Sequence, residues 1–366
     1  GPALAAVGRT AEGVTTSAEG FREHAALAEP LALAHPGTHL VNQAYALVEA
    51  GRLAEADDLA TVGYEVAGTD NVPIAQIWFA LVLGKAAMLR GQAQESRRWY
   101  QEGASTARLH GFRGPLRIAL SGQASADAVL AQGPAASEAM AESGLLPPYP
   151  FLGHDQAVGP AWTAWAEGDP ARARAGLVAE AEAATTSHNV ASAVWLWHDA
   201  ARLGATHVGP ALRAVAARSD SPLHAARAAH VTALEAGDAD GLTAATDLLE
   251  GLGTLLFAAE AASAASDAHR RAGRQRLATN LAHRSAQLAA QCPDVHTPAL
   301  VRTEGSVALT AREREVASLA AQGTSSQDIA DRLFVSIRTV NNHLQNAYTK
   351  LGVNRRDQLA AALGSR

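Results

Sequence analysis

The sequence has few aromatic residues, a single cysteine and no long apolar run, and these scarcities exclude several classes of protein. One cysteine, Cys292, cannot form an internal disulfide, so a disulfide-stabilised scaffold is excluded. No apolar run reaches the roughly 18 residues that a membrane-spanning helix needs. With 31 Gly and 15 Pro in 366 residues, the chain is neither collagen-like nor low-complexity, and 48% hydrophobic residues argue against intrinsic disorder. The length suits two or three globular domains.

Alternating strand patterns are also rare, and residues 3–291 are rich in the helix formers Ala, Leu, Glu and Arg. A glycine followed by a helix-forming segment recurs at spacings of 35 to 42 residues, apart from one spacing of 69 that is close to two units. These glycines are Gly51, Gly91, Gly133, Gly168, Gly237 and Gly273, and Gly204 or Gly209 would mark the missing turn. The period predicts a solenoid of helical hairpins, each ended by a left-handed glycine. The units resemble tetratricopeptide repeats.

Three short segments interrupt this pattern. Pro147-Pro148-Tyr149-Pro150 cannot lie within a helix, so it predicts a long loop or a seam near residues 145–152. Residues 292–308 carry two prolines and a glycine without periodicity and are interpreted as a linker. The initial Gly1-Pro2 is typical of the remnant of a cleaved tag. The predicted domains are therefore a helical-repeat domain at 3–291, the linker, and a compact segment at 309–366.

The segment 309–366 predicts four short helices, each with its own start signal. Thr310 with Glu313 and Ser325 with Asp328 have the spacing of capping boxes, and Ser336 is a good N-cap for the third helix. Asn354 with Asp357 opens the fourth helix, while Gly323 and Gly352 end the first and third. One small core is expected from Val316, Leu319, Ile329, Leu333, Val340, Leu344 and Leu351. The second and third helices, joined through residues 333–336, predict a helix-turn-helix.

This segment resembles the DNA-binding domain of LuxR-type transcriptional regulators, a four-helix helix-turn-helix family. The resemblance rests on Leu309, Thr310, Arg312, Glu313, Glu315, Val316, Leu319, Gly323, Ile329, Ala330, Leu333, Ser336, Thr339, Val340, His343, Leu344, Lys350, Leu351, Gly352, Val353 and Arg355, which follow the family's spacing without insertion. The implied fold is an all-α, tetratricopeptide-like solenoid followed by a four-helix DNA-binding domain. The implied function is transcriptional regulation in the cytoplasm, with double-stranded DNA and RNA polymerase as partners.

The charge distribution agrees with this resemblance. The whole chain has a net charge of −6, which by itself argues against binding to nucleic acid. Residues 309–366, however, carry eight Lys and Arg against five Asp and Glu, or +3, whereas the preceding residues carry 22 against 31, or −9. A basic module therefore follows an acidic one, and only the basic module needs to face the phosphates.

By the resemblance, the third helix enters the major groove. The predicted base contacts are Asn341, Asn342 and Gln345, since amides can bond to the edge of adenine. The predicted phosphate contacts are Arg338, Thr339, Lys350, Arg355 and Arg356. The family usually has Lys at position 341 and often another near 345, so fewer cations are available here, which suggests a homodimer on DNA or help from a partner protein. The alternative is a protein-interaction scaffold with a vestigial DNA-binding module.

LuxR-type modules that follow helical repeats resemble the large ATP-binding regulators related to the maltose-system activator. This chain lacks a G-x-x-x-x-G-K-[ST] motif, because Gly84-Lys85 has no upstream glycine at the required spacing. We therefore expect either the C-terminal part of such a regulator or a smaller relative without an ATPase. No enzymatic activity and no cofactor are expected in this chain, and ATP would belong to an N-terminal domain outside it.

The solenoid is expected to sense a small-molecule inducer or a protein partner. The candidate apolar ligand site is Tyr149, Trp162, Trp165, Trp195, Trp197 and His198, because these aromatic residues gather in the central repeats of an aromatic-poor chain. The alternative, which general experience favours, is ordinary packing between helices, as expected for Trp78, Phe79, Trp99 and Tyr100. The fourteen histidines are scattered, so no metal site is expected.

Overall fold

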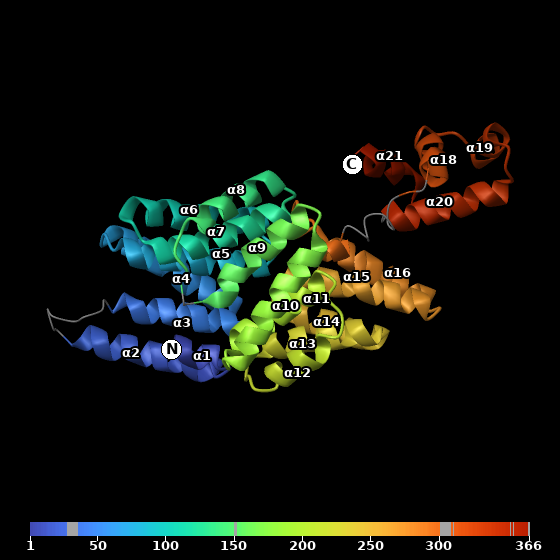
Figure 1. Cartoon of the computed structure of the whole chain (residues 1–366). Helices are drawn as coiled ribbons and strands as arrows, with labels where there is room; N and C mark the ends of the chain where they lie inside the picture. The colour runs from blue at the N-terminus through green and yellow to red at the C-terminus, as the bar shows by residue number, and fades with distance from the viewer. Residues whose placement is uncertain are drawn as a thin grey trace. The chain divides into compact units, whose positions relative to one another are not determined.

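The computed structural model describes residues 1–27, 36–149, 152–300, 309, 311–351, 353 and 355–364. Within these residues the regular structure is helical throughout, which confirms the predicted all-α class (Figure 1). The chain forms two compact units, Gly1–Leu300 and Val301–Arg366. No helix in the described ranges is both long and apolar enough to cross a bilayer.

The first unit is a solenoid of antiparallel helices in which most neighbours in sequence are neighbours in space. Its helices are α1 (Pro2–Ala6), α2 (Thr10–Ala26), α3 (Gly37–Glu49), α4 (Leu53–Thr69), α5 (Pro73–Leu89), α6 (Ala93–His110), α7 (Arg113–Val129), α8 (Gly133–Gly144), α9 (Gly153–Ala166), α10 (Pro170–Thr186), α11 (Val190–Arg202), α12 (Gly209–Ala216), α13 (Pro222–Ala236), α14 (Ala239–Gly251), α15 (Leu255–Arg271) and α16 (Gln275–Ala289). Because α1 begins at Pro2, a residue attributed to a tag from sequence is part of a helix.

The recurring glycines mostly lie where the sequence predicts them, in the turns between helices. Positive φ angles of 63° to 92° occur at Gly51, Gly91, Gly168, Gly204, Gly237 and Gly273. Gly133 is an exception, since it begins α8 and the left-handed residue of that turn is Ala131, with φ of 57°. The turn therefore keeps its geometry while the glycine lies two residues later.

Glycines inside the helices allow aromatic rings to lie against the backbone of neighbouring helices. Tyr100 of α6 lies between Gly84 of α5 and Gly122 of α7, where an added Cβ would come within 2.9 Å and 2.3 Å of its ring. The ring is buried, with 6% of Tyr100 exposed. Small residues thus let three helices approach closely, which is how an Ala- and Gly-rich chain with few aromatics builds a dense core.

The solenoid curls until segments about 200 residues apart touch. The Asp220 carboxylate accepts hydrogen bonds from the backbone N–H and the hydroxyl of Thr10, at 2.8 and 2.6 Å. The Gln92 side chain donates to the carbonyl of Gln291 at 2.8 Å, and α5 contacts α15. An open array of repeats makes only neighbour-to-neighbour contacts, so this closure encloses an interior that an open solenoid lacks.

Two of the predicted interruptions lie within the first unit. The connection from α8 to α9 covers residues 145–152, and the unit continues across it without division; Pro150 and Phe151 lie outside the described residues. The predicted linker begins with packed residues, because Cys292 and Leu300 are buried and the backbone N–H of His296 donates to Val129 at 2.6 Å. The rest of the predicted linker, residues 301–308, lies outside the described residues.

The second unit contains α18 (Ala311–Ala321), α19 (Ser326–Leu333), α20 (Ile337–Leu351), a short 3-10 helix η1 (Arg356–Gln358) and α21 (Leu359–Gly364). Its separate core confirms most of the residues expected from the helical spacing. Those buried are Leu309, Val316, Ala317, Leu319, Ala320, Ile329, Ala330, Val340, Leu344, Ala347 and Leu359, with Leu333 packed against them. The predicted signals at Thr310, Gly352 and Asn354 fall on residues outside the description.

Candidate functional site

The helix-turn-helix of the second unit is organised by two serine caps, as the sequence predicts. The Ser325 hydroxyl accepts a hydrogen bond from the backbone N–H of Asp328 at 3.2 Å and donates to its carboxylate at 2.6 Å. The Ser336 hydroxyl accepts from the backbone N–H of Thr339 at 3.1 Å. Both helices therefore begin at fixed residues, which sets the phase of every side chain that follows.

A side chain of α18 stabilises the turn between α19 and α20. Arg312 donates to the carbonyl of Leu333 at 2.7 Å, and it also pairs with Glu315 at 2.7 Å. Phe334 takes a left-handed conformation, with φ of 54°, and its side chain is 95% exposed. A cation on the last carbonyls of α19 satisfies groups that a helix end leaves unpaired, so it stabilises the turn that orients α20.

Helix α20 has one buried and one exposed face. Val340, Leu344 and Ala347 are at most 5% exposed and pack against α18 and α19. The three predicted base-contacting residues, Asn341, Asn342 and Gln345, are all exposed, and Arg338 is exposed as well. The amides are thus presented to solvent on a rigid helix, which is the arrangement that reading of base edges requires.

The predicted phosphate contacts do not all occupy equivalent positions. Arg338 and Arg355 are exposed, whereas Thr339 is partly buried with its hydroxyl bonded to Ser336 at 2.8 Å. The side chain of Lys350 lies outside the described residues. Arg356 is directed at the unit itself, since its guanidinium donates to the carbonyl of Ala320 at 3.3 Å and also to that of Thr324. Its surroundings therefore indicate a structural role for Arg356 in holding η1 against α18.

In the solenoid, the six candidate ligand residues do not surround one cavity. Trp162, Trp195, Trp197 and His198 are buried to 8% exposure or less, and Trp165 and Tyr149 are partly buried. Trp162 packs edge-on against Trp165, the Trp197 indole donates to Thr185 at 3.1 Å, and Tyr149 lines a separate depression. The geometry of most of them is that of inter-helix packing, the alternative that the sequence left open.

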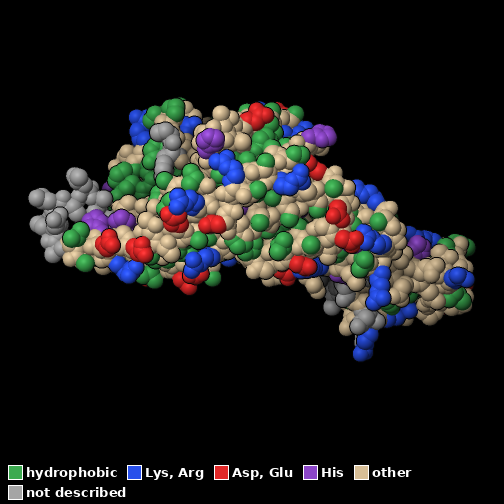
Figure 2. Space-filling model, turned by 90° about the horizontal axis from the view of Figure 1, so that it is seen from below, with side chains coloured by type: hydrophobic (Ala, Val, Ile, Leu, Met, Phe, Trp, Pro, Cys, Tyr) green, Lys and Arg blue, Asp and Glu red, His purple; other side chains and the backbone are tan. Residues whose placement is uncertain are grey.

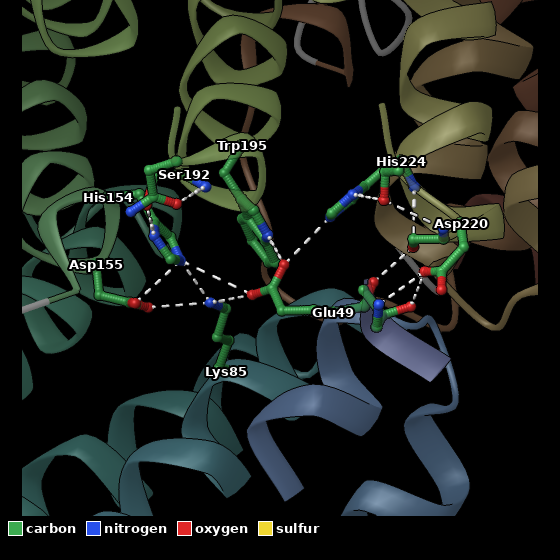
Figure 3. A network of polar contacts seen from close by, with 12 residues as sticks. Glu49, Lys85, His154, Asp155, Ser192, Trp195, Asp220 and His224 are labelled. Carbon is green, nitrogen blue, oxygen red and sulfur yellow. Dashed lines mark hydrogen bonds and ion pairs between the residues drawn. The ribbon is translucent and has the colours of Figure 1, made fainter. Parts of the chain in front are cut away.

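The interior of the solenoid instead contains a buried polar cluster that sequence reasoning missed. We call it the Glu49 network (Figure 3); its members are Glu49, Lys85, His154, Asp155, Ser192, Trp195 and His224. One Glu49 carboxylate oxygen accepts from the Lys85 ammonium at 2.9 Å. The other accepts from the Trp195 indole at 2.7 Å and lies 3.2 Å from the His224 ring. The network joins α3 and α5 to α9, α11 and α13.

The far side of Lys85 is also occupied. Its ammonium lies 3.3 Å from the Asp155 carboxylate and 2.6 Å from the His154 ring, which in turn meets the Ser192 hydroxyl at 2.7 Å. The only local signal of this cluster is a charge inside an apolar stretch, as at Lys85 in the run from Ile74 to Leu89. Because the partners of Lys85 come from distant repeats, this signal does not indicate which residues they are.

Burial and charge act in opposite directions on the carboxylates of the network. Burial alone raises the pKa of Glu49, but Lys85 and the His224 and His154 rings outweigh it and hold the pKa well below its usual range. The pKa of Asp155 is lowered in the same way, against burial, by His154 and Lys85. Both groups are therefore ionised in the folded chain, in which ion pairing compensates for lost hydration.

A cavity of about 810 Å³ lies beside this network, with Glu49, His154 and Ser192 in its wall. Trp78, which the sequence assigns to plain core, also lines it, and so does Tyr45. None of the six residues chosen from sequence is among its described lining residues. Within the described residues, no group of three or more His, Cys, Asp or Glu is arranged to hold a metal ion.

The face of the solenoid seen in Figure 2 gives no comparable signal. Figure 2 shows Asp, Glu, Lys and Arg side chains interspersed over its visible face rather than gathered into one charged patch. The exposed ion pairs include Arg52 with Glu55 and Arg108 with Glu142, the latter at 2.7 Å. Such pairs contribute little and leave the interior and the second unit as the candidate functional regions.

Comparison with known proteins identifies the second unit. Residues 307–363 match the model of the family described as bacterial regulatory proteins, luxR family. A putative HTH-type transcriptional regulator of Mycobacterium tuberculosis is 53% identical over 60 residues, which are 16% of this chain and 7% of that protein. The spore germination protein GerE of Bacillus subtilis is 49% identical over 55 residues, 15% of this chain and 74% of GerE.

The similarity extends to other named regulators and again covers only a small share of the chain. The DNA-binding transcriptional activator DevR/DosR of Mycobacterium tuberculosis is 40% identical over 52 residues, or 14% of this chain and 24% of that protein. The chain thus aligns with only 7% of the length of the putative HTH-type regulator of Mycobacterium tuberculosis and with about three quarters of GerE. Through its C-terminal domain, the chain belongs to the luxR family of bacterial regulatory proteins.

Proposed function

We propose that this chain is a DNA-binding transcriptional regulator in which α20 reads the major groove and the solenoid senses a small molecule. The observation that carries the first part is the exposed amide face of α20, Asn341, Asn342 and Gln345, on a helix fixed by its own core. Family membership of residues 307–363 supports the same conclusion. The second part is supported by the cavity beside the Glu49 network.

The roles within the module follow from exposure and charge. Arg338 and Arg355 are proposed to contact phosphates, which position the helix, while the amides select the base pairs. Because few cations are exposed on this face among the described residues, we propose that two copies bind one operator, so that phosphate contacts are doubled. RNA polymerase is the proposed partner at the promoter, and we propose no catalytic role for the chain.

The test is DNA binding by the full chain, measured by fluorescence anisotropy on fragments from upstream of its own gene. Affinity should fall steeply with salt, because neutralised phosphates release counterions. Replacing Asn342 and Gln345 together by Ala should weaken binding to the preferred fragment and leave binding to unrelated DNA nearly unchanged. Each lost amide–base pair is worth about 1–3 kcal/mol, or roughly fivefold to 150-fold in affinity.

The matched control is Gln322→Ala, which removes an exposed amide at the end of α18, outside α20. If the double variant binds the preferred fragment as tightly as this control, the base-reading role is wrong. If the unmodified chain binds no DNA even at low salt but retains a stable protein partner, the alternative of an interaction scaffold is supported instead.

A further inference from the structure

The cavity beside the Glu49 network lies between two parts of the solenoid that are distant in sequence. One side is formed by α1, α3 and the start of α5, and the other by the start of α9, the end of α10 and α11. Its volume of about 810 Å³ is in the range of pockets that hold drug-sized ligands. A molecule bound there would contact repeats that are about 150 residues apart in the chain.

The walls of the cavity are mostly apolar. The apolar lining residues are Pro2, Ala3, Ala5, Ala6, Val41, Val72, Ile74, Ala75, Trp78, Leu152, Ala183, Ala184, Ala191 and Leu196. Trp78 and Tyr45 meet edge to face, with ring centroids 6.2 Å apart, so one wall is aromatic. Such a surface favours a ligand with an aromatic or aliphatic body, because its burial removes apolar area from water on both partners.

The polar side chains of the described lining are Thr38, Asn42, Tyr45, Glu49, His154, Glu180, Ser187, Asn189 and Ser192. Glu49, His154 and Ser192 belong to the network, and Tyr45 and Asn42 lie on the same helix as Glu49. Within the described residues, neither the Tyr45 hydroxyl nor the Asn42 amide has a hydrogen-bond partner. These two groups are therefore available to a ligand, whereas the network groups are already bonded to one another.

The charges around the cavity discriminate against anions. None of its described lining residues is Lys or Arg, while Glu49 and Glu180 both carry carboxylates into the wall. Lys85 lies behind the wall, and its ammonium is already shared by Glu49, Asp155 and His154. An acid entering the cavity would lose its hydration without meeting a free Lys or Arg side chain, which is costly at such a site.

From these observations we infer that the cavity binds an uncharged or cationic molecule with a predominantly apolar body and a hydrogen-bonding group that meets Tyr45 and Asn42. Organic acids and phosphorylated metabolites are excluded by the same charges. This inference deepens the proposed sensing function and rests on it, since it assigns the chemical class of the inducer. A ligand of this class bridges α3 and α5 to α9, α10 and α11, and therefore stabilises the closed solenoid.

The experiment compares two fluorescent probes that share one aromatic skeleton. N-phenyl-1-naphthylamine is uncharged, and 8-anilinonaphthalene-1-sulfonate adds a sulfonate to the same skeleton. Titrated into the full chain, the neutral probe should bind once per chain with a blue-shifted emission and should raise the unfolding temperature. The sulfonate should bind at least about tenfold more weakly, because its charge is buried beside carboxylates.

Two variants test whether the probe binds in this cavity. Ala75→Trp fills the cavity from the partly buried first turn of α5, and Thr38→Trp narrows it from the exposed start of α3, where folding is little affected. Either one should weaken the neutral probe by about tenfold or more. The control is Ala54→Trp on the exposed face of α4, which should change nothing.

Equal or tighter binding of the sulfonate would overturn the inference, as would neutral-probe binding that survives both cavity variants. DNA affinity, measured on the same samples by anisotropy, separates this inference from the proposed function. A chain that binds the neutral probe but no DNA refutes the regulator proposal alone. A chain that binds DNA and discriminates against neither probe refutes the assignment of ligand class alone.

Discussion

Replacing Glu49 by Ala tests whether the buried network holds the solenoid closed. The substitution removes the acceptor of the Trp195 indole and the His224 ring, and one of the two carboxylates that pair with Lys85. A buried donor left without a partner costs about 1–3 kcal/mol, and breaking a buried ion pair from one side costs about 3–5 kcal/mol. We expect the free energy of unfolding to fall by about 4 kcal/mol, within that range.

The assay is urea unfolding followed by tryptophan fluorescence. All six tryptophans lie in the first unit, so the signal reports the solenoid without interference from the DNA-binding unit. The free energy is obtained by linear extrapolation to water. The matched control is Glu55→Ala, which removes an exposed carboxylate paired with Arg52 and should cost less than about 1 kcal/mol.

The pH dependence gives the same test an internal check. Because the pKa of Glu49 lies well below the 4.5 of an ordinary glutamate, its contribution is fully present above pH 4.5. That contribution is lost as the pH falls below 4.5, toward the pKa of the folded chain. The difference between the variant and the unmodified chain should therefore shrink in acid. A loss at neutral pH no larger than that of Glu55→Ala would refute the reasoning.

Five further substitutions test the solenoid with the same assay. Burial lowers the pKa of His230 to about 4, so the unfolded chain takes up a proton first and stability should fall between pH 6.5 and 4; His230→Gln should remove up to roughly 3 kcal/mol of that dependence. Arg227 is buried, and its guanidinium has no hydrogen-bond partner among the described residues, so Arg227→Met should leave the free energy of unfolding at pH 7 unchanged or raise it. By contrast, Arg202→Met breaks the buried ion pairs with Asp199 and Glu260 and should cost about 3–5 kcal/mol. A large loss of stability in Arg227→Met would contradict this expectation. Gly159→Ala should cost about 1–3 kcal/mol, because its Cβ would lie 2.6 Å from the backbone of α7, while Gly176→Ala, with open space around it, should stabilise α10 by up to about 1 kcal/mol.

The parts of the structure that were predictable depend on local interactions. Ser325 and Ser336 cap α19 and α20 because their hydroxyls bond backbone groups three residues away, a relation visible in the sequence itself. The faces of α20 follow from the helical period alone, so Val340 and Leu344 are buried and Asn341 is exposed as expected. The recognition of the DNA-binding unit thus required no tertiary information.

The repeat pattern was predictable for the same reason, with one instructive exception. Glycine ends most helices at the predicted positions because a positive φ is strained for residues with a Cβ. At Ala131 the surrounding helices impose that conformation on an alanine, and Gly133 is free to begin α8. Sequence therefore predicts where turns occur more reliably than which residue of the turn is left-handed.

The functional residues of the interior were not predictable. Glu49 meets Trp195 and His224 across 146 and 175 residues, and no period or motif relates positions so far apart. Rarity in the sequence singled out the central tryptophans, yet Trp195 became part of the network and Trp78, assigned to plain core, lines the cavity. The rarity of a residue type is a property of the composition, whereas the position of a pocket depends on how helix surfaces pack against one another.

What the sequence alone determined is the all-α class, the spacing of the hairpins and the DNA-binding unit with its exposed amide face. Each of these depends on contacts within about four residues or on a pattern repeated along the chain. Only the tertiary structure decided that the solenoid curls until Thr10 reaches Asp220, and that the Glu49 network and the cavity beside it form in its interior. The degree of curling is the sum of small rotations between successive helices, and those rotations are set by side-chain packing that no single segment encodes.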